Sequence, residues 1–354
     1  MKQTIRYTRS ADGTALAWAS VGEGPPLVRA ANWLTHLEYD LESPVWSHWV
    51  HFLADHFRLV RYDERGCGLT DRDVEDLSFE RWVEDLEAVV EAAGVDEPFA
   101  LLGVSQGAAA ALAFAERHPE RVSRVIVYGG YAQGWRVRGD VKGGQLFESI
   151  IQVVRLGWDA ENPVFRELFT KRFLPAGNEE QISWFNQLCR KTATAQMAAR
   201  LLAARADIDV RELLPRVRVP VLVVHPRYDE VVPFTRGQQI ASELPDAEFV
   251  AIDSRNHIVL KHEPAWTSFK EAVLDFTGRT AVSGRGRQPN LATLSPRERE
   301  ILDLICAAKS NPEIAAALNL SERTVRNHAS NLFRKIGVKS RAEAILYLHG
   351  GLGR

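Results

Sequence analysis

The chain has 354 residues, of which 45% are hydrophobic and 25% are charged, and its formal net charge is −2. At roughly 150 residues per domain this length predicts about two domains, and the composition excludes a disordered or fibrous protein. The apolar runs are shorter than the roughly 18 residues that span a bilayer, so we expect no membrane association. No apolar segment comes directly after the first residues, so we expect no signal peptide. Three widely separated cysteines indicate a cytoplasmic protein without a disulfide framework or a metal site, and they are Cys67, Cys189 and Cys306.

The first 279 residues alternate short apolar runs with helical periods. Two alternating stretches, Thr4–Arg9 and Ala15–Trp18, flank Asp12-Gly13 and predict a β-hairpin. Further strands are predicted at Pro26–Val28, Phe57–Val60, Phe99–Leu102, Val122–Tyr128, Val221–Val224 and Phe249–Ile252. Helical periods lie between most of them, for example at 79–93 and 108–117. This order predicts an α/β domain with a mostly parallel sheet covered on both faces.

One segment breaks this alternation, because no strand is predicted from Tyr131 to about Leu214. Its helical stretches are rich in aromatic residues, namely Trp135, Trp158, Phe165, Phe169, Phe173, Trp184 and Phe185. One interpretation is a set of extra helices that closes the core. We favour a helical lid over about 131–214, whose aromatic underside walls a pocket at the carboxyl edge of the sheet.

The sequence Gly103-Val104-Ser105-Gln106-Gly107 joins a predicted strand to an alanine-rich helix. A tight strand-to-helix turn strains the backbone of its central serine, and small residues two before and two after it relieve the crowding. Such a turn lifts the Ser105 hydroxyl above the sheet and leaves the Gln106 N–H free to bind an oxyanion. We therefore predict Ser105 as a nucleophile.

An acid and a histidine follow the serine in the expected chain order. Asp229 comes directly after the strand at 221–224, and His257 follows the last predicted strand. Asp229 would orient His257, which would take the proton from Ser105. Asp253 is a weaker alternative for the acid, and each partner taken alone could instead be an ordinary loop residue.

Residues 5–278 resemble the α/β-hydrolase fold. The stretch Arg61–Asp71 is similar to a strand-end motif of that family, D-x-R-G-x-G-x-S-D. The resemblance implies a second oxyanion donor, and the matching position is the main chain of Trp33. The usual His-Gly pair is absent there and Asn32 stands where the glycine is expected, which favours ligand binding without turnover. The loop that carries Asp229, here called the acid loop, and the stretch from Arg255 to His257 resemble a subgroup that is fused to DNA-binding domains.

The charge of the chain is unevenly distributed. Residues 290–354 carry a net charge of +4, whereas residues 1–280 carry −8. A basic tail on an acidic body indicates an anionic partner for the tail. The glycine-rich and polar residues 280–290 have no apolar periodicity and are predicted to link a domain at 1–279 to a domain at 291–354.

The tail is predicted to form a helix-turn-helix. Ser295, Pro296 and Glu298 have the spacing of a capping box that starts a helix, Ser310 starts a second helix, and Ser321 starts a third. On the third helix one apolar stripe is formed by Val325, Ala329, Leu332 and Ile336. From 321 to 341 there are six basic residues and one acidic residue. A solvated charged face is the simple alternative, but these side chains include the donors and acceptors that contact bases.

The tail also resembles the LuxR-type helix-turn-helix family, from Leu294 through Ala344. We expect base-edge and nearby phosphate contacts early in the third helix, from Arg323, Thr324, Arg326 and Asn327, with Asn331 on the same face. Phosphate contacts are expected from Arg334, Lys335 and Lys339. The resemblance implies a fourth helix at about 341–348 that pairs two domains into a homodimer on double-stranded DNA.

The sequence therefore predicts a cytoplasmic transcription regulator whose α/β-hydrolase-fold domain senses a small molecule. The ligand is expected to be apolar or like an ester or lactone, no cofactor is expected, and RNA polymerase is a further candidate partner. The alternatives are an active serine hydrolase or esterase that carries a DNA-binding domain, and a sensor that slowly hydrolyses its own ligand.

Overall fold

The computed structural model describes residues 1–139, 141–279, 296–306, 309–318, 320–322, 324–325, 329 and 332. The chain divides into two compact units, Met1–Ala281 and Val282–Arg354. No helix within the described ranges is both long and apolar enough to cross a membrane.

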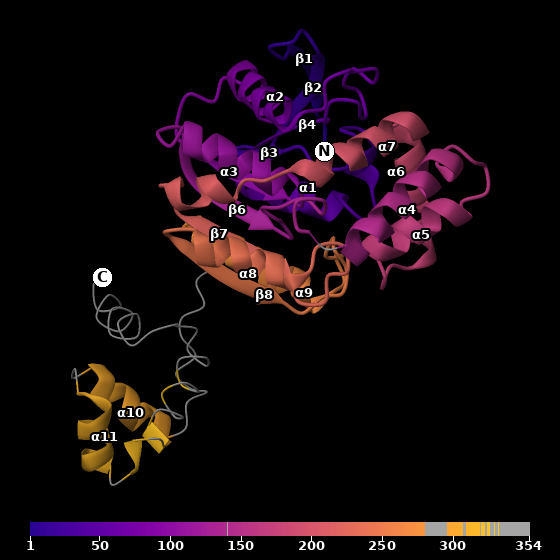
Figure 1. Ribbon diagram of the computed structural model, residues 1–354. Coiled ribbons are helices and arrows are strands. Elements are labelled where there is room, and N and C mark those ends of the chain that lie inside the picture. Colours follow the sequence, from indigo (N-terminus) through magenta and orange to yellow (C-terminus); the bar gives the residue numbers. More distant parts are fainter. Residues whose placement is uncertain are drawn as a thin grey trace. The chain divides into compact units, whose positions relative to one another are not determined.

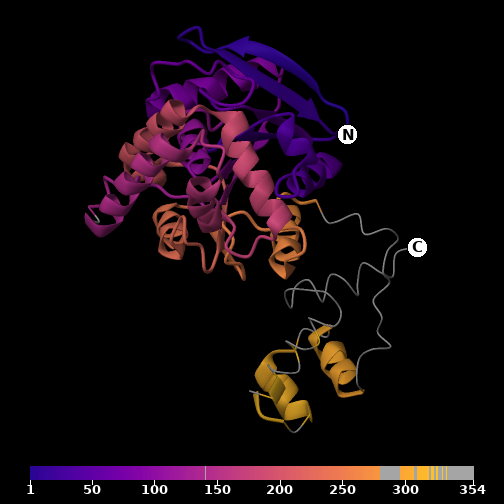
Figure 2. The same cartoon turned by 90° about the vertical axis from the view of Figure 1, so that its right-hand side faces the viewer.

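The first unit is built on an eight-stranded sheet with the order β1-β2-β4-β3-β5-β6-β7-β8. The strands are β1 (Thr4–Arg9), β2 (Ala15–Val21), β3 (Pro26–Ala30), β4 (Arg58–Tyr62), β5 (Phe99–Val104), β6 (Val122–Tyr128), β7 (Val221–Pro226) and β8 (Ala247–Ile252). The β1–β2 and β2–β4 pairs are antiparallel and all other pairs are parallel, which confirms the mostly parallel sheet. The β1–β2 hairpin forms one edge of this sheet (Figure 2).

Helices cover both faces of the sheet (Figures 1 and 2). On one face α1 (Ser47–His56) and α9 (Pro264–Phe276) pack together, with the Trp49 ring 4.3 Å from the Phe269 ring. The other face carries α2 (Phe79–Ala92), α3 (Gly107–Arg117) and α8 (Phe234–Glu243), and α2 packs against α3. The first nine residues of α3 are all buried, since its alanines allow a close approach to β5 and β6.

A block of helices separates β6 from β7, and we call it the lid. It contains α4 (Val141–Gly157), α5 (Val164–Phe173), α6 (Glu179–Thr192) and α7 (Ala195–Ala204). Two 3₁₀ turns, η2 (Arg205–Asp207) and η3 (Arg211–Arg216), lead back to the sheet, and a further one, η1 (Tyr39–Glu42), precedes α1. The four helices contact one another and form a group at one end of the sheet (Figure 1).

The second unit contains α10 (Pro296–Cys306) and α11 (Asn311–Leu318) within its described residues. Glu313, in the first turn of α11, caps the start of this helix, because its carboxylate accepts hydrogen bonds from the Ser310 N–H at 2.7 Å and the Ser310 hydroxyl at 2.8 Å. Residues of the predicted third-helix stripe are buried with those of α10 and α11, and this small core comprises Ile301, Leu302, Ile305, Ile314, Ala315, Val325, Ala329 and Leu332.

Candidate active site and DNA-binding domain

Ser105 stands at the junction of β5 and α3 in a strained conformation. Its φ is 54°, a left-handed value that non-glycine residues rarely adopt, and its N–H donates to the Tyr128 carbonyl at 2.9 Å. A Cβ on Gly103 would lie 2.5 Å from the Ala108 Cα, and one on Gly107 would lie 2.8 Å from the Ala31 oxygen. Both glycines are therefore needed for the turn that presents the Ser105 hydroxyl.

The structure brings Asp229 and His257 together at the carboxyl ends of β7 and β8. The His257 Nδ1 lies 2.6 Å from the Asp229 Oδ2, and both residues are buried. The other carboxylate oxygen of Asp229 accepts the N–H groups of Val231 at 2.8 Å and Val232 at 3.0 Å. Because Nδ1 donates to a carboxylate, Nε2 carries the lone pair that a general base needs. The Asp253 side chain is exposed.

Phe173 of the lid holds both the backbone and the ring of His257. The His257 backbone N–H donates to the Phe173 carbonyl at the end of α5, at 2.8 Å, and the Phe173 ring packs edge-on at 5.3 Å. The His257 Nε2 is buried and has no hydrogen-bond partner within the described part of the chain, so the Ser105–His257 hydrogen bond is not formed. The position of the lid is thus coupled directly to that of His257.

The predicted oxyanion donor Trp33 is already engaged. Its backbone N–H donates to the Gln106 Oε1 at 3.1 Å, so this N–H already has an acceptor within the chain. Asn32 is fixed by the buried Arg29, whose Nη2 donates to its Oδ1 at 2.6 Å. Leu34 has a φ of 61°, so the loop is strained next to this donor.

A buried ion pair lies behind the Gln106 side chain, and neither partner was predicted from the sequence. The Arg205 Nη2 lies 2.5 and 2.6 Å from the two carboxylate oxygens of Glu64. The Arg205 guanidinium also stacks over the rings of Trp33 and Trp82, 4.8 and 5.3 Å from their centroids. Burial raises the pKa of Glu64 and the neighbouring Arg205 charge opposes that rise. Glu64 lies within the 61–71 motif, but no pattern marked Arg205.

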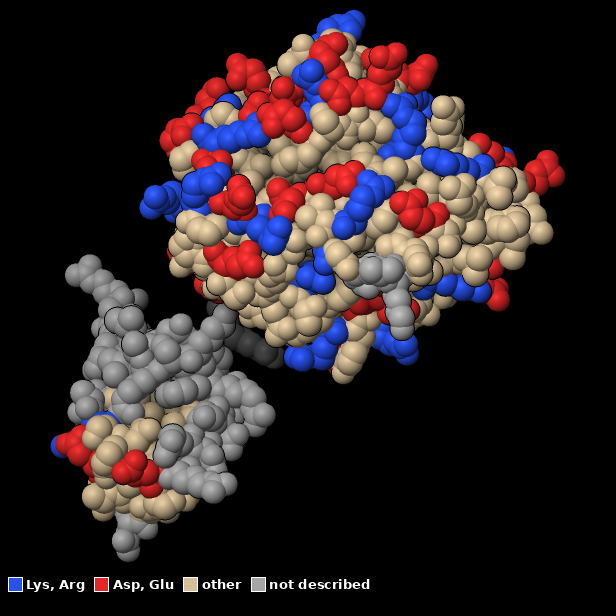
Figure 3. Space-filling model, in the orientation of Figure 1, with Lys and Arg blue, Asp and Glu red and all other residues tan. Residues whose placement is uncertain are grey.

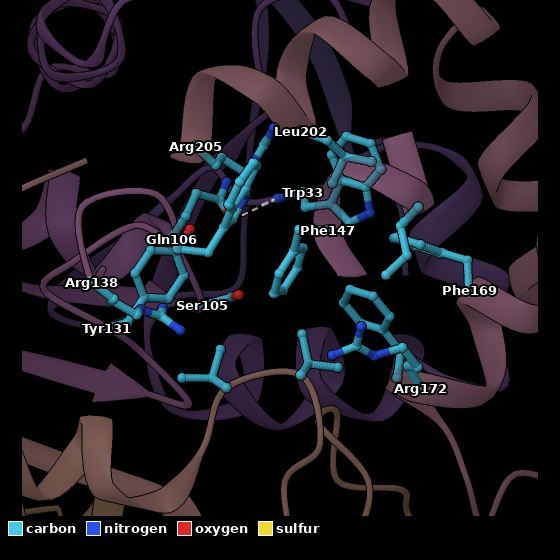
Figure 4. Close-up of a pocket in the computed structure, with 15 residues that line it drawn as sticks. Trp33, Ser105, Gln106, Tyr131, Arg138, Phe147, Phe169, Arg172, Leu202 and Arg205 are labelled. Carbon is cyan, nitrogen blue, oxygen red and sulfur yellow. Dashed lines mark hydrogen bonds between the residues drawn. The ribbon is translucent and has the colours of Figure 1, made fainter. Parts of the chain in front are cut away.

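The serine faces a largely apolar pocket between the sheet and the lid (Figure 4). The pocket has a volume of about 70 Å³. Its lining residues are Trp33, Ser105, Gln106, Tyr131, Trp135, Arg138, Phe147, Ile150, Phe169, Arg172, Phe173, Leu202, Arg205, Val231 and Val232. Of the aromatic residues predicted to wall a pocket, Trp135, Phe169 and Phe173 line it. Phe165 is 44% exposed on the lid surface.

Most of the predicted DNA-contacting residues lie outside the described residues, namely Arg323, Arg326, Asn327, Asn331, Arg334, Lys335 and Lys339. Thr324 is described, and its N–H donates to the Ser321 hydroxyl at 3.1 Å. This is the hydrogen bond expected where Ser321 caps the start of a helix.

Two family models match the chain at separate regions. The model described as "Serine aminopeptidase, S33" matches residues 45–265, which include Ser105, Asp229 and His257. The chain belongs to this family of α/β-hydrolases. The model described as "Bacterial regulatory proteins, luxR family" matches residues 292–348. The α/β-hydrolase domain is therefore followed by a LuxR-type helix-turn-helix domain, which implies DNA binding and transcription regulation.

Individual relatives match the α/β-hydrolase domain and the tail separately. The AB hydrolase superfamily protein YisY of Bacillus subtilis is 25% identical over 261 residues, covering 71% of this chain and 91% of that protein. The spore germination protein GerE of Bacillus subtilis is 49% identical over 55 residues, covering 16% of this chain and 74% of that protein. A hydrolase from Pseudomonas aeruginosa shares the fold, with a TM-score of 0.65 at 24% identity, over 78% of this chain and 98% of that one.

Proposed function

We propose that this α/β-hydrolase is a receptor that binds a small molecule and thereby controls sequence-specific DNA binding by its LuxR-type domain. The two matched families support the pairing of a pocket with a DNA-binding domain. A homodimer would place two third helices about one turn of the double helix apart. Base contacts by Arg323, Thr324, Arg326 and Asn327, and an interaction with RNA polymerase, belong to this proposal.

One observation carries the choice of a receptor over a fast enzyme. The Trp33 N–H is donated to the Gln106 side chain, and a tetrahedral intermediate would have to displace that amide before it gained its second donor. Losing one oxyanion donor lowers turnover by about 10²–10³ in enzymes that use such donors. The pocket can still bind a ligand by its aromatic walls without using that donor.

The second candidate is a serine hydrolase, and the Asp229–His257 hydrogen bond of 2.6 Å favours it. In this mechanism the Ser105 oxygen would attack an ester carbonyl while His257 Nε2 takes the hydroxyl proton. His257 would then return the proton to the leaving alkoxide, and water would release the acyl group by the same route. Such chemistry would reset the regulator by destroying its ligand.

The test compares wild type with Ser105→Ala in two assays. Cleavage of p-nitrophenyl butyrate measures hydrolysis. Binding to a duplex selected from a random pool, with and without a panel of esters, lactones and aromatic acids, measures sensing. A receptor keeps its ligand-dependent change in DNA affinity in Ser105→Ala, weakened by about 1 kcal/mol for one neutral hydrogen bond. If ester cleavage and the DNA response disappear together in the mutant, the hydrolase is the correct function.

A further inference from the structure

The lid contributes an arginine, Arg172, whose guanidinium has one buried nitrogen without a hydrogen-bond partner in the described part of the chain. It lies in the last turn of α5 and lines the pocket. Its Nη2 donates to the Glu230 main-chain carbonyl at 2.9 Å, and its guanidinium lies over the Phe147 ring at 5.2 Å. Its Nη1 is buried and has no hydrogen-bond partner among the residues that the structure describes. Figure 4 shows the side chain reaching from its helix toward the middle of the pocket.

Arg172 is not paired in a salt bridge within the described ranges, although the charges of Glu230 and Asp229 act on it. Across the described ranges no carboxylate lies within ion-pair distance of it, and the nearby Asp229 carboxylate already accepts His257 and two backbone N–H groups. Burial lowers the pKa of Arg172, which reflects the cost of holding this cation away from water. Arg172 is half-buried, and a partly desolvated cation without a salt-bridge partner is unfavourable, so the site gains stability when an anion binds there.

The other arginines in the pocket are placed differently. Arg205 is neutralised by Glu64 in the buried ion pair described above. Arg138 donates through Nε to the Gln133 carbonyl at 2.7 Å and lies over the Tyr131 ring. The lining includes three arginines and no aspartate or glutamate, and most of the remaining wall is aromatic or aliphatic. This composition favours an anion with an apolar body over a neutral or cationic ligand.

We infer that the ligand of the proposed receptor is an apolar carboxylic acid whose carboxylate binds the free edge of the Arg172 guanidinium. A planar guanidinium matches a carboxylate with two parallel hydrogen bonds, and the aromatic walls cover the apolar body. The inference rests on the proposed function and specifies the ligand class of the same pocket.

The position of Arg172 connects a bound carboxylate to other segments of the domain. Arg172 precedes Phe173, whose carbonyl holds the His257 N–H at 2.8 Å, and it is bonded to Glu230, the residue after Asp229. A carboxylate bound at Arg172 therefore stabilises the lid against the two loops that follow β7 and β8. The acid acts at the junction of these three segments.

The experiment is isothermal titration calorimetry on the full chain with phenylacetate and hexanoate, and with their neutral amides phenylacetamide and hexanamide. Each amide has nearly the shape of its acid and lacks only the charge. We expect the acids to bind at least about tenfold more tightly than their amides, as for a charge-assisted bidentate hydrogen bond. In Arg172→Met and Arg172→Gln the acids should fall to the affinity of the amides.

The matched control is Arg155→Met, which removes an exposed arginine of the same lid and should leave every affinity unchanged. The inference is overturned if no acid binds, if acids and amides bind equally to wild type, or if both Arg172 variants keep the preference. DNA binding measured in the same samples separates the two proposals. Acids that bind through Arg172 without changing DNA affinity would refute the sensor and leave the acid site standing.

Discussion

At the scale of single residues, Gln106 contributes to the site in two opposing ways. Its backbone N–H lies at the start of α3, where the first amides have no acceptor within the helix and can stabilise an oxyanion. Its side-chain oxygen meanwhile accepts the Trp33 N–H at 3.1 Å and withdraws the second donor. In the proposed oxyanion site, Gln106 would therefore supply one donor while its side chain occupies the other.

Replacing Gln106 by methionine tests this arrangement. Gln106→Met keeps the backbone N–H and the side-chain length but removes the acceptor, so the Trp33 N–H becomes available to a substrate oxygen. We expect turnover of p-nitrophenyl butyrate to rise by up to about 10²-fold, the usual worth of one oxyanion donor. The double variant with Ser105→Ala should be inactive. Unchanged turnover in Gln106→Met would show that the side chain does not restrict catalysis.

A second residue, His48 on α1, contacts the loop that follows β8 and carries His257. The His48 Nε2 lies 3.1 Å from the Val259 carbonyl, which also accepts the Trp49 indole N–H at 3.1 Å. Burial lowers the pKa of His48 to about 4. Since an unfolded histidine takes up a proton below about pH 6.5, the unfolded chain binds more protons between pH 6.5 and 4. The stability from neutral His48 is therefore complete above pH 6.5 and is lost as the pH falls toward 4.

His48→Gln isolates this pH dependence, because glutamine can still donate to Val259 but does not titrate. Between pH 7.5 and 5 the wild type should lose about 2 kcal/mol more of its free energy of unfolding than the variant. Urea unfolding followed by tryptophan fluorescence measures this free energy of unfolding at each pH. All nine tryptophans precede residue 267, so the fluorescence reports on the first unit. Parallel pH profiles for the two proteins would contradict the assignment.

At the scale of elements, the β5–α3 junction depends on a close approach of backbones. At Gly103 a Cβ would meet backbone atoms of the helix, including the Gly107 oxygen at 2.7 Å, so neither element can yield without moving Ser105. Gly144 in α4 is a suitable contrast, since a Cβ there would lie 3.9 Å from the Trp135 ring in ordinary contact.

We expect Gly103→Ala to lower the free energy of unfolding by about 1–3 kcal/mol through this overpacking. Gly144→Ala should raise it by about 0.5–1 kcal/mol, because alanine restricts the unfolded chain and favours a helix. Thermal unfolding of both variants beside the wild type measures the difference. Equal melting temperatures for the two variants would refute the crowding at the junction.

At the scale of the whole molecule, the two units differ in charge. On the face of the first unit drawn in Figure 3, acidic and basic side chains are interspersed rather than gathered by sign. Residues 290–354 carry +4, although the chain as a whole carries −2. The affinity for DNA, a polyanion, is therefore expected to come from the LuxR-type domain.

Removal of residues 291–354 should abolish binding to duplex DNA. For the full chain the logarithm of affinity should fall linearly with the logarithm of salt concentration, with a slope of about −0.9 for each phosphate contacted. Fluorescence anisotropy of a labelled duplex, titrated at several salt concentrations, measures both effects. DNA binding that survives the truncation would place the affinity in the hydrolase domain instead.

The sequence by itself determined the features that depend on local order. Periodicity gave the strand and helix positions, and the G-x-S-x-G turn and the strand ends located Ser105, Asp229 and His257, because these signals lie within a few neighbouring residues. Boundaries were less well determined. β5 extends two residues beyond its predicted end, to Val104, because Gly103 and Val104 pair with Val127 and Tyr128 of β6.

Only the tertiary structure decided which groups meet across long sequence separations. Arg205 and Glu64 are 141 positions apart, Trp33 and Gln106 are 73 apart, and nothing in either local sequence specifies the other. The unused N–H of Arg172 likewise became visible only when α5 was placed against the acid loop. Hydrogen bonding and desolvation depend on distances in space, so a periodic pattern in the chain cannot encode them one residue at a time.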